Sequence, residues 1–188
     1  MKGQDQACET ETFLLIPHTV TALAELAAGP DQYLVSVDAE PKGAAKIWFD
    51  RAARNPFGGA GCVHIRYFEE QLIPLELWDD TVGIWDALLD AMEGFLATGV
   101  GRGNFSPEFS LVGSIHAASF SAHGVSHQVD PLELIPAVLD GAQRYFSWIE
   151  NMVGRSYPEI IERIQTMTVS LNSFSPTRAV TKESHPRA

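Results

Sequence analysis

Four short segments rich in apolar residues follow one another between residues 33 and 78, with only turns between them. They span residues 33–37, 45–49, 62–68 and 72–78, and the turns at 40–43 and 55–61 contain proline and glycine. Segments of this length and composition predict β-strands, and Pro74 places the last one at an edge or a bulge. Because no crossover helix separates them, the strands are predicted to form an antiparallel meander. A further apolar run at residues 13–16 predicts another strand.

Two long helices are predicted after the meander, at residues 81–97 and 130–152. The first follows Asp79 and Asp80, either of which can cap it, and the second follows Asp130 with Pro131 at its first position. Pro136 is expected in the first turn of the second helix or at a kink. Shorter helices are predicted at 19–28 and 158–165, and further strands at 109–115, 117–122 and 167–171, whereas 99–103 is expected to be a connector.

The helix at 81–97 has two distinct faces. At 100° per residue, its broad apolar face is formed by Val82, Trp85, Leu88, Leu89, Met92 and Leu96. A second strip contains only small residues, namely Gly83, Ala87, Ala91 and Gly94. Glycine inside a helix costs about 1 kcal/mol relative to alanine. Such a strip lets another backbone approach closely, and a weak homodimer through it is one possibility.

The length and composition predict one α+β domain. The chain has 188 residues, of which 45% are hydrophobic, which is enough for a core. We expect a flexible N-terminus at 1–10, a domain at 11–171 with a mostly antiparallel sheet packed against the two longer helices, and a disordered polar tail at 172–188. A monomer or a weak homodimer is expected.

The sequence favours a soluble cytoplasmic protein. It lacks the order of basic and then apolar residues that defines a signal peptide, and its most apolar helix is interrupted by Asp86, Asp90 and Glu93. Cys8 and Cys62 are too few for a disulfide framework and are expected to be reduced, with Cys8 in the flexible N-terminus.

The acidic residues are concentrated in one stretch. Between Arg66 and Arg102 there is no lysine or arginine, and the acids there account for most of the net charge of −11. Nucleic acid is therefore not expected as a ligand, because it requires a basic patch. A field of one sign attracts a basic partner, although a solvated surface is the alternative. The predicted partner-binding carboxylates are Glu69, Glu70, Glu76, Asp79, Asp80, Asp86, Asp90 and Glu93.

Trp78 is the predicted apolar anchor of this surface. It directly precedes Asp79 and Asp80, and a partly exposed tryptophan ringed by carboxylates is a frequent interface hot spot. The alternative is that Trp78 belongs to the core, as we expect of most aromatic residues here.

No catalytic or cofactor signature accompanies the acidic stretch. His123 and His127 have the spacing of a helical metal pair, but their surroundings predict strand and turn, so neither they nor His116 is assigned to a metal. The glycine loops at 58–61 and 99–103 lie before a strand and after a helix, which is the wrong order for a phosphate cradle. A nucleophile elbow is missing, and adjacent acids do not form a dyad. We therefore expect no cofactor and no enzymatic activity.

The order of these features resembles that of immunity proteins of bacterial polymorphic and contact-delivered toxins. The resemblance extends over residues 11–153 and rests on the segments at 33–37 and 46–49, the Trp78-Asp79-Asp80 sequence before a helix, and a long helix that ends at 145–149. It implies an acidic cytosolic α+β domain without catalytic residues. It also implies a protein partner, namely the cognate toxin or effector domain, a nuclease or a deaminase for example, whose active site it occludes.

Two other functions remain open. An acidic secretion chaperone or adaptor would need an exposed hydrophobic groove, or dimerisation through the small-residue strip. An enzyme of unrecognised class would need His116, His123 and His127 to converge beside an acid. The function predicted from the sequence is nonetheless a non-enzymatic inhibitor of a basic toxin domain that acts without a membrane or nucleic acid.

Overall fold

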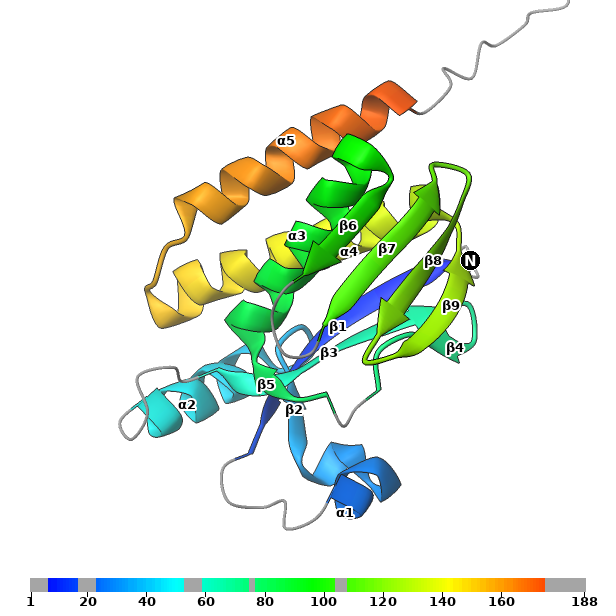
Figure 1. The fold of residues 1–188 in the computed structure, drawn as a ribbon. Coiled ribbons are helices and arrows are strands. Elements are labelled where there is room, and N and C mark those ends of the chain that lie inside the picture. Colours follow the sequence, from blue (N-terminus) through cyan, green and yellow to red (C-terminus); the bar gives the residue numbers. More distant parts are fainter. Residues whose placement is uncertain (1–6, 17–22, 53–58, 75–76, 104–107, 175–188) are drawn as a thin grey trace, which may run out of the picture.

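The α+β class and the antiparallel strand pairing are confirmed by the computed structural model, which describes residues 7–16, 23–52, 59–74, 77–103 and 108–174 (Figure 1). The strands form two sheets. Sheet A has the order β2-β1-β3-β4, with β5 also paired to β3, and sheet B has the order β6-β7-β8-β9. Every pairing is antiparallel.

Sheet A is built around a long central pair of strands. These are β1 (Cys8–Leu15) and β3 (Ala60–Tyr67), which are flanked by β2 (Leu34–Ser36), β4 (Glu70–Gln71) and β5 (Asp79–Asp80). Because side chains alternate along a strand, Thr12, Leu14, Val63 and Ile65 face the main core. The opposite face packs Leu15, Leu34 and Cys62 beneath Leu26 of α1 (Leu23–Ala28). A 3₁₀ turn, η1 (Pro30–Gln32), connects α1 to β2.

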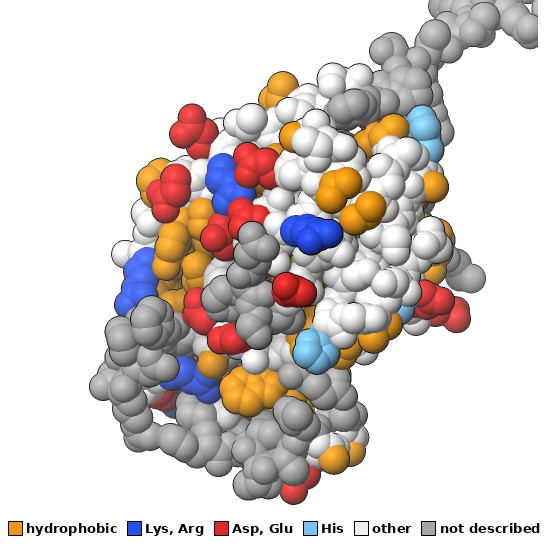
Figure 2. Space-filling view, in the orientation of Figure 1, with side chains coloured by type: hydrophobic (Ala, Val, Ile, Leu, Met, Phe, Trp, Pro, Cys, Tyr) orange, Lys and Arg blue, Asp and Glu red, His pale blue; other side chains and the backbone are white. Residues whose placement is uncertain are grey.

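Sheet B is a meander that packs on α3. Its strands are β6 (Val100–Gly103), β7 (Phe109–Ser114), β8 (Ala117–Ala122) and β9 (Val125–Val129). Phe109, Leu111 and Phe120 are buried on the inner face, whereas Val100 and Val112 are exposed on the outer face. In Figure 2 this outer face carries few charged side chains.

Helices cover the core faces of both sheets. α3 (Thr81–Thr98) contacts β3, β6 and β7, and α4 (Pro131–Trp148) contacts β1. α4 continues as a π-helical turn, η2 (Ile149–Val153), which packs on α2 (Pro41–Ala52). α5 (Pro158–Phe174) crosses α3 and α4 on their outer side (Figure 1).

Buried polar contacts fix α3 between sheet A and α4. The indole Nε1 of Trp85 donates to Thr12 Oγ1 at 3.1 Å. The Thr81 hydroxyl donates to the Gly59 carbonyl at 2.6 Å and lies 2.5 Å from the Tyr145 hydroxyl. The predicted caps are confirmed, because Asp80 accepts from the Gly83 amide and Asp130 from the Leu132 amide.

Several predicted elements were wrong in type. Residues 45–49 are helical, because Pro41 begins α2 and the buried positions Ala44, Ala45 and Trp48 recur at helical spacing. Residues 72–74 are not a strand, and β5 is limited to Asp79–Asp80. Residues 167–171 continue α5, since Ile160, Ile164, Met167 and Leu171 repeat every three or four residues.

The predicted limits of the domain also change. Cys8 is 1% exposed within β1, so the first ten residues are not all a flexible N-terminus. The last helix extends to Phe174, beyond the predicted start of the tail at 172. The predicted start of the helix at 19–22, part of the 55–61 loop and the tail from 175 lie outside the described residues. Strand β9 was not predicted, and β6 occupies most of the expected connector.

Candidate functional site

The predicted acidic residues lie on three separate parts of the molecule. Glu69 and Glu70 lie at the β3–β4 turn, and Asp79 and Asp80 pair with the other end of β3. Their partners in β3, Tyr67 and Ala60, are seven residue steps apart, which corresponds to about 23 Å. Asp86, Asp90 and Glu93 lie along α3, and Glu76 is outside the described residues. The sequence cluster therefore does not form one continuous docking surface.

The three acids of α3 share one guanidinium. Arg163 of α5 lies 2.8 Å from Asp86, 2.7 Å from Asp90 and 2.8 Å from Glu93. The three carboxylates remain 45% to 53% exposed, whereas Arg163 is 26% exposed. Figure 2 shows acidic side chains gathered around a basic one on this side of the molecule. This cluster attaches α5 to α3 and keeps a surplus of negative charge at the surface.

Trp78 is at the surface, as predicted. Its side chain is 41% exposed, and the neighbouring Asp79 is exposed too. Asp80 is less accessible, because one carboxylate oxygen caps α3 and the other is buried without a hydrogen-bond partner among the described residues. Burial raises the pKa of Asp80, the adjacent Asp79 adds to this, and the Gly83 amide and Arg155 oppose it.

A second exposed aromatic residue was missed by the sequence reasoning. Phe68 is 63% exposed, precedes Glu69 and Glu70, and has a φ of 53°. A bulky residue is rarely found at positive φ, where it costs of the order of 1 kcal/mol. Its ring contacts Tyr67 edge-on at 4.8 Å. The alternating pattern of residues 62–68 predicted that Phe68 belongs to the strand. The turn that exposes Phe68 depends instead on the pairing of β3 with β4, which the sequence does not show.

The three histidines that were considered for catalysis do not converge. His116 and His123 lie in the turns at opposite ends of β8, and His127 lies in β9. His127 Nδ1 is 3.2 Å from the Glu70 carboxylate. Within the described ranges, no group of three His, Cys, Asp or Glu side chains is placed to hold a metal ion. The described helices also include none with the length and hydrophobicity of a membrane span.

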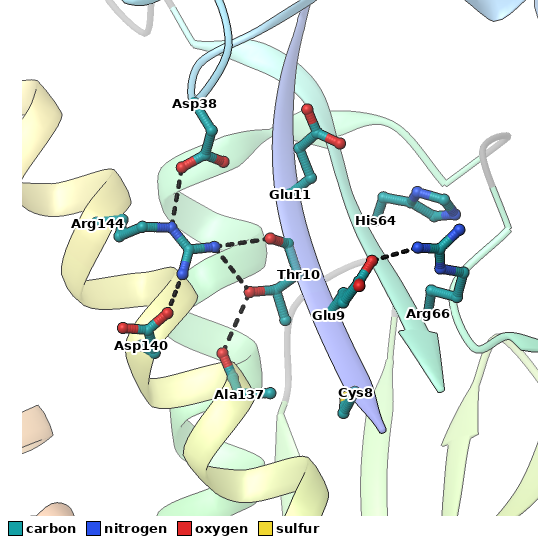
Figure 3. Close-up of a pocket in the computed structure, with 10 residues that line it drawn as sticks. All are labelled: Cys8, Glu9, Thr10, Glu11, Asp38, His64, Arg66, Ala137, Asp140 and Arg144. Atoms are coloured by element: carbon teal, nitrogen blue, oxygen red, sulfur yellow. Dashed lines mark hydrogen bonds and ion pairs between the residues drawn. The ribbon is translucent and has the colours of Figure 1, made fainter. Parts of the chain in front are cut away.

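A polar pocket of about 620 Å³ lies on the outer face of sheet A, beside the part of β1 that β2 leaves unpaired (Figure 3). We call it the β1 pocket. Glu9 and Glu11 enter it from β1, and His64 and Arg66 from β3. The strand register places Glu9 opposite Arg66, with which it forms an ion pair, and Glu11 opposite His64.

Arg144 of α4 closes the open edge of β1 at this pocket. Its guanidinium donates to the Thr10 carbonyl at 2.7 Å and to Asp38 at 2.9 Å, and it pairs with Asp140 (Figure 3). The Thr10 hydroxyl in turn donates to the Ala137 carbonyl at 3.2 Å. An unpaired strand edge is a site of unwanted association, and here charged side chains cover it.

A second cavity, of about 560 Å³, is an apolar groove between α4 and α5. Leu132, Pro136, Leu139, Ile164 and Leu171 line it. Val169, also part of the lining, is 70% exposed. This groove is the exposed hydrophobic surface that a secretion chaperone or adaptor would need.

The small-residue strip of α3 is occupied within the chain. Gly101 and Gly103 of β6 lie against it so closely that added Cβ atoms would come within 1.6 Å of the Ala91 carbonyl oxygen and 2.0 Å of the Ala87 carbonyl oxygen. Ala87 and Ala91 are buried. This strip is therefore not free to form a dimer, so dimerisation through it does not favour a chaperone.

Comparisons with protein-family models, with curated proteins and with solved structures found no match.

Proposed function

We propose that this protein is a non-enzymatic inhibitor that binds a basic protein domain, as immunity proteins of bacterial toxin systems do, at the surface where α3 begins. The observation that carries the proposal is Trp78, a half-exposed indole beside the exposed carboxylate of Asp79. An aromatic side chain that loses its remaining water in a complex contributes more binding energy than its polar neighbours. The partner would be a toxin or effector domain in the cytoplasm, whose substrate-binding Lys and Arg pair with carboxylates.

The acids of α3 support this proposal through their charge. Arg163 neutralises one of the three negative charges at Asp86, Asp90 and Glu93, so two remain. Because the ion pairs restrict these side chains, less entropy is lost when a partner arrives. The charge would increase the association rate, and the buried indole would set the residence time.

The experiment is affinity capture from a lysate of the source cells, at low and then moderate salt, followed by an inhibition assay. We expect one basic domain to be retained, and its activity to be inhibited at a 1:1 ratio. Trp78→Ala is expected to weaken binding about thirtyfold or more, since hot-spot truncation costs about 2 kcal/mol. Asp79→Lys should slow association. Unchanged capture by both variants would exclude this surface.

The control is Glu69→Lys, which makes the same charge change in an exposed turn at the end of β3 opposite to Asp79. Charge reversal at Asp86 is not a suitable test, because it would place a lysine beside Arg163. The control should bind like the unmodified protein, and each variant should keep its melting temperature.

A second candidate function is an effector chaperone or adaptor, which the apolar groove between α4 and α5 favours. A bound effector segment would bury Val169 and the neighbouring leucines. In that case Val169→Asp should abolish capture and Trp78→Ala should not. The opposite pattern is expected for the inhibitor.

A further inference from the structure

The β1 pocket has a chemistry of its own, distinct from the surface at Trp78. Its lining includes four carboxylates, Glu9, Glu11, Asp38 and Asp140, but only the guanidiniums of Arg66 and Arg144. The lining therefore holds a surplus of two negative charges when the histidine is neutral. The pocket is large enough for a ligand of several non-hydrogen atoms, since its volume is about 620 Å³.

The positive charges of the pocket are already satisfied. Arg144 uses its three nitrogens on Asp38, Asp140 and Thr10, and Arg66 pairs with Glu9 (Figure 3). An anion would have to compete with these carboxylates for the guanidiniums, and the surplus of negative charge in the lining would repel it. An anionic ligand is therefore disfavoured.

Glu11 is the carboxylate without a cationic partner among the described residues. The Ser36 hydroxyl donates to its Oε1 at 2.5 Å, and Ser36 Oγ accepts from the Ala39 amide at 3.0 Å. The half-buried carboxylate is thus held in place before any ligand binds. A preorganised negative charge in a partly desolvated site attracts a cation more strongly than a freely rotating one.

His64 lies opposite Glu11 and supplies the second polar contact. Its ring is half-buried, packs against Phe13 at 6.4 Å, and makes no hydrogen bond to another described residue. Burial lowers its pKa from 6.5, Glu11 opposes this effect, and Arg66 adds to it. At neutral pH the imidazole is therefore uncharged, with one ring nitrogen able to accept a hydrogen bond.

We propose that the β1 pocket binds an alkylammonium or guanidinium group, with Glu11 as its counter-ion and His64 as a hydrogen-bond acceptor. Such a group carries several N–H donors, which match one fixed carboxylate and one neutral imidazole. It belongs either to a free diamine or to a Lys or Arg side chain of a protein. The proposal does not depend on the inhibitor function.

The test is an NMR titration of the ¹⁵N-labelled protein with N-acetyl-lysine amide, N-acetyl-arginine amide and putrescine as probes. Sodium chloride at matched ionic strength is the reference. We expect saturable shifts of the His64 ring and of the amides of residues 9–11 and 64–66. Glu11→Gln, which keeps an oxygen for the Ser36 hydroxyl, should weaken binding about tenfold, the loss of one charge-assisted contact.

The matched control is Glu69→Gln, which removes one negative charge from an exposed turn outside the pocket. Its affinity should stay within about a factor of two of the unmodified protein, as expected for a screened surface charge. Shifts spread over the whole acidic surface, or equal affinities of the two variants, would overturn the proposal.

Asp38→Asn separates the two sources of the cation. Putrescine that spans the pocket should be weakened by both Glu11→Gln and Asp38→Asn, because its second ammonium group would contact Asp38, which Arg144 holds through Oδ1. A single side-chain cation should be weakened by Glu11→Gln alone. If putrescine binds more tightly than the amino-acid amides and is weakened by both variants, the pocket is assigned to a diamine. If an amino-acid amide binds more tightly than putrescine, the pocket is assigned to a protein side chain.

Discussion

Burial in sheet A controls the chemistry of both cysteines. Cys8 and Cys62 are 1% and 0% exposed and form no disulfide. Burial raises the pKa of each thiol to about 12, and nearby glutamates add to the effect. The reactive thiolate is then about one part in ten thousand at pH 8. Their number in the sequence predicted reduced cysteines, but their protection depends on strand pairing.

We predict that neither thiol reacts with Ellman's reagent at pH 8 in the native protein. Both should react within minutes in 6 M guanidinium chloride, since unfolding removes the burial that raises the pKa. The measurement is absorbance of the released thionitrobenzoate. Rapid labelling of either cysteine under native conditions would contradict its burial in sheet A.

His64 should make the fold sensitive to mild acid. Because burial lowers its pKa from 6.5, the unfolded chain binds the proton more readily than the native protein does. The contribution of the neutral His64 to stability is thus fully present above about pH 6.5 and is lost as the pH falls through its lower native pKa. His64→Gln should flatten the pH dependence of urea unfolding between neutral pH and about pH 5. Parallel curves for His64→Gln and the unmodified protein would refute this assignment.

At the scale of elements, capping and periodicity predicted α3 and α4 well, because both signals are local. The predicted strand at 45–49 was wrong because its four apolar residues fit either period. The start of α2 at Pro41 and the burial of Trp48 against Trp148, 5.9 Å away, decide for a helix. The small-residue strip predicted that a backbone would approach α3. The strip did not indicate that this backbone is β6, because the glycines of residues 99–103 predicted a connector.

Gly101→Ala is predicted to destabilise the protein by about 3 kcal/mol or to prevent folding, since overpacking against a backbone cannot be relieved by a rotamer change. The added Cβ would lie 1.6 Å from the Ala91 carbonyl oxygen, so β6 must separate from α3. The measurement is urea unfolding followed by circular dichroism. Gly43→Ala is the control, because its Cβ meets nothing closer than 3.6 Å and helix propensity favours alanine. Similar losses in the two variants would show that close packing is not the cause.

At the scale of the whole molecule, the acidic stretch is a structural feature as well as a candidate surface. This stretch contains no basic residue, so the sequence alone predicted that its acids either bind a partner or are solvated. The cation that pairs with α3 is Arg163, which lies 70 or more residues later in the chain. Only the packing of α5 across α3 brings it there, and no sequence spacing encodes such a contact. The β1 pocket was missed for the same reason, because it combines β1, β3 and α4.

Removing Arg163 separates the structural role of these acids from their role in binding. Arg163→Met keeps a side chain of similar length but leaves Asp86, Asp90 and Glu93 to repel one another across one helix face. We expect a loss of about 1 kcal/mol at low salt, since the carboxylates are half-exposed, and a smaller loss in 1 M NaCl, where screening extends to about 3 Å. Urea unfolding at the two salt concentrations measures both values. Arg102→Met, at an exposed position of β6, is the control and should show no salt-dependent loss.

Because Arg163→Met raises the surplus on α3 from two negative charges to three, it should also speed the association of a basic partner while weakening the fold. A variant with slower association and lower stability would show instead that the partner needs the ordered α3–α5 packing rather than its charge.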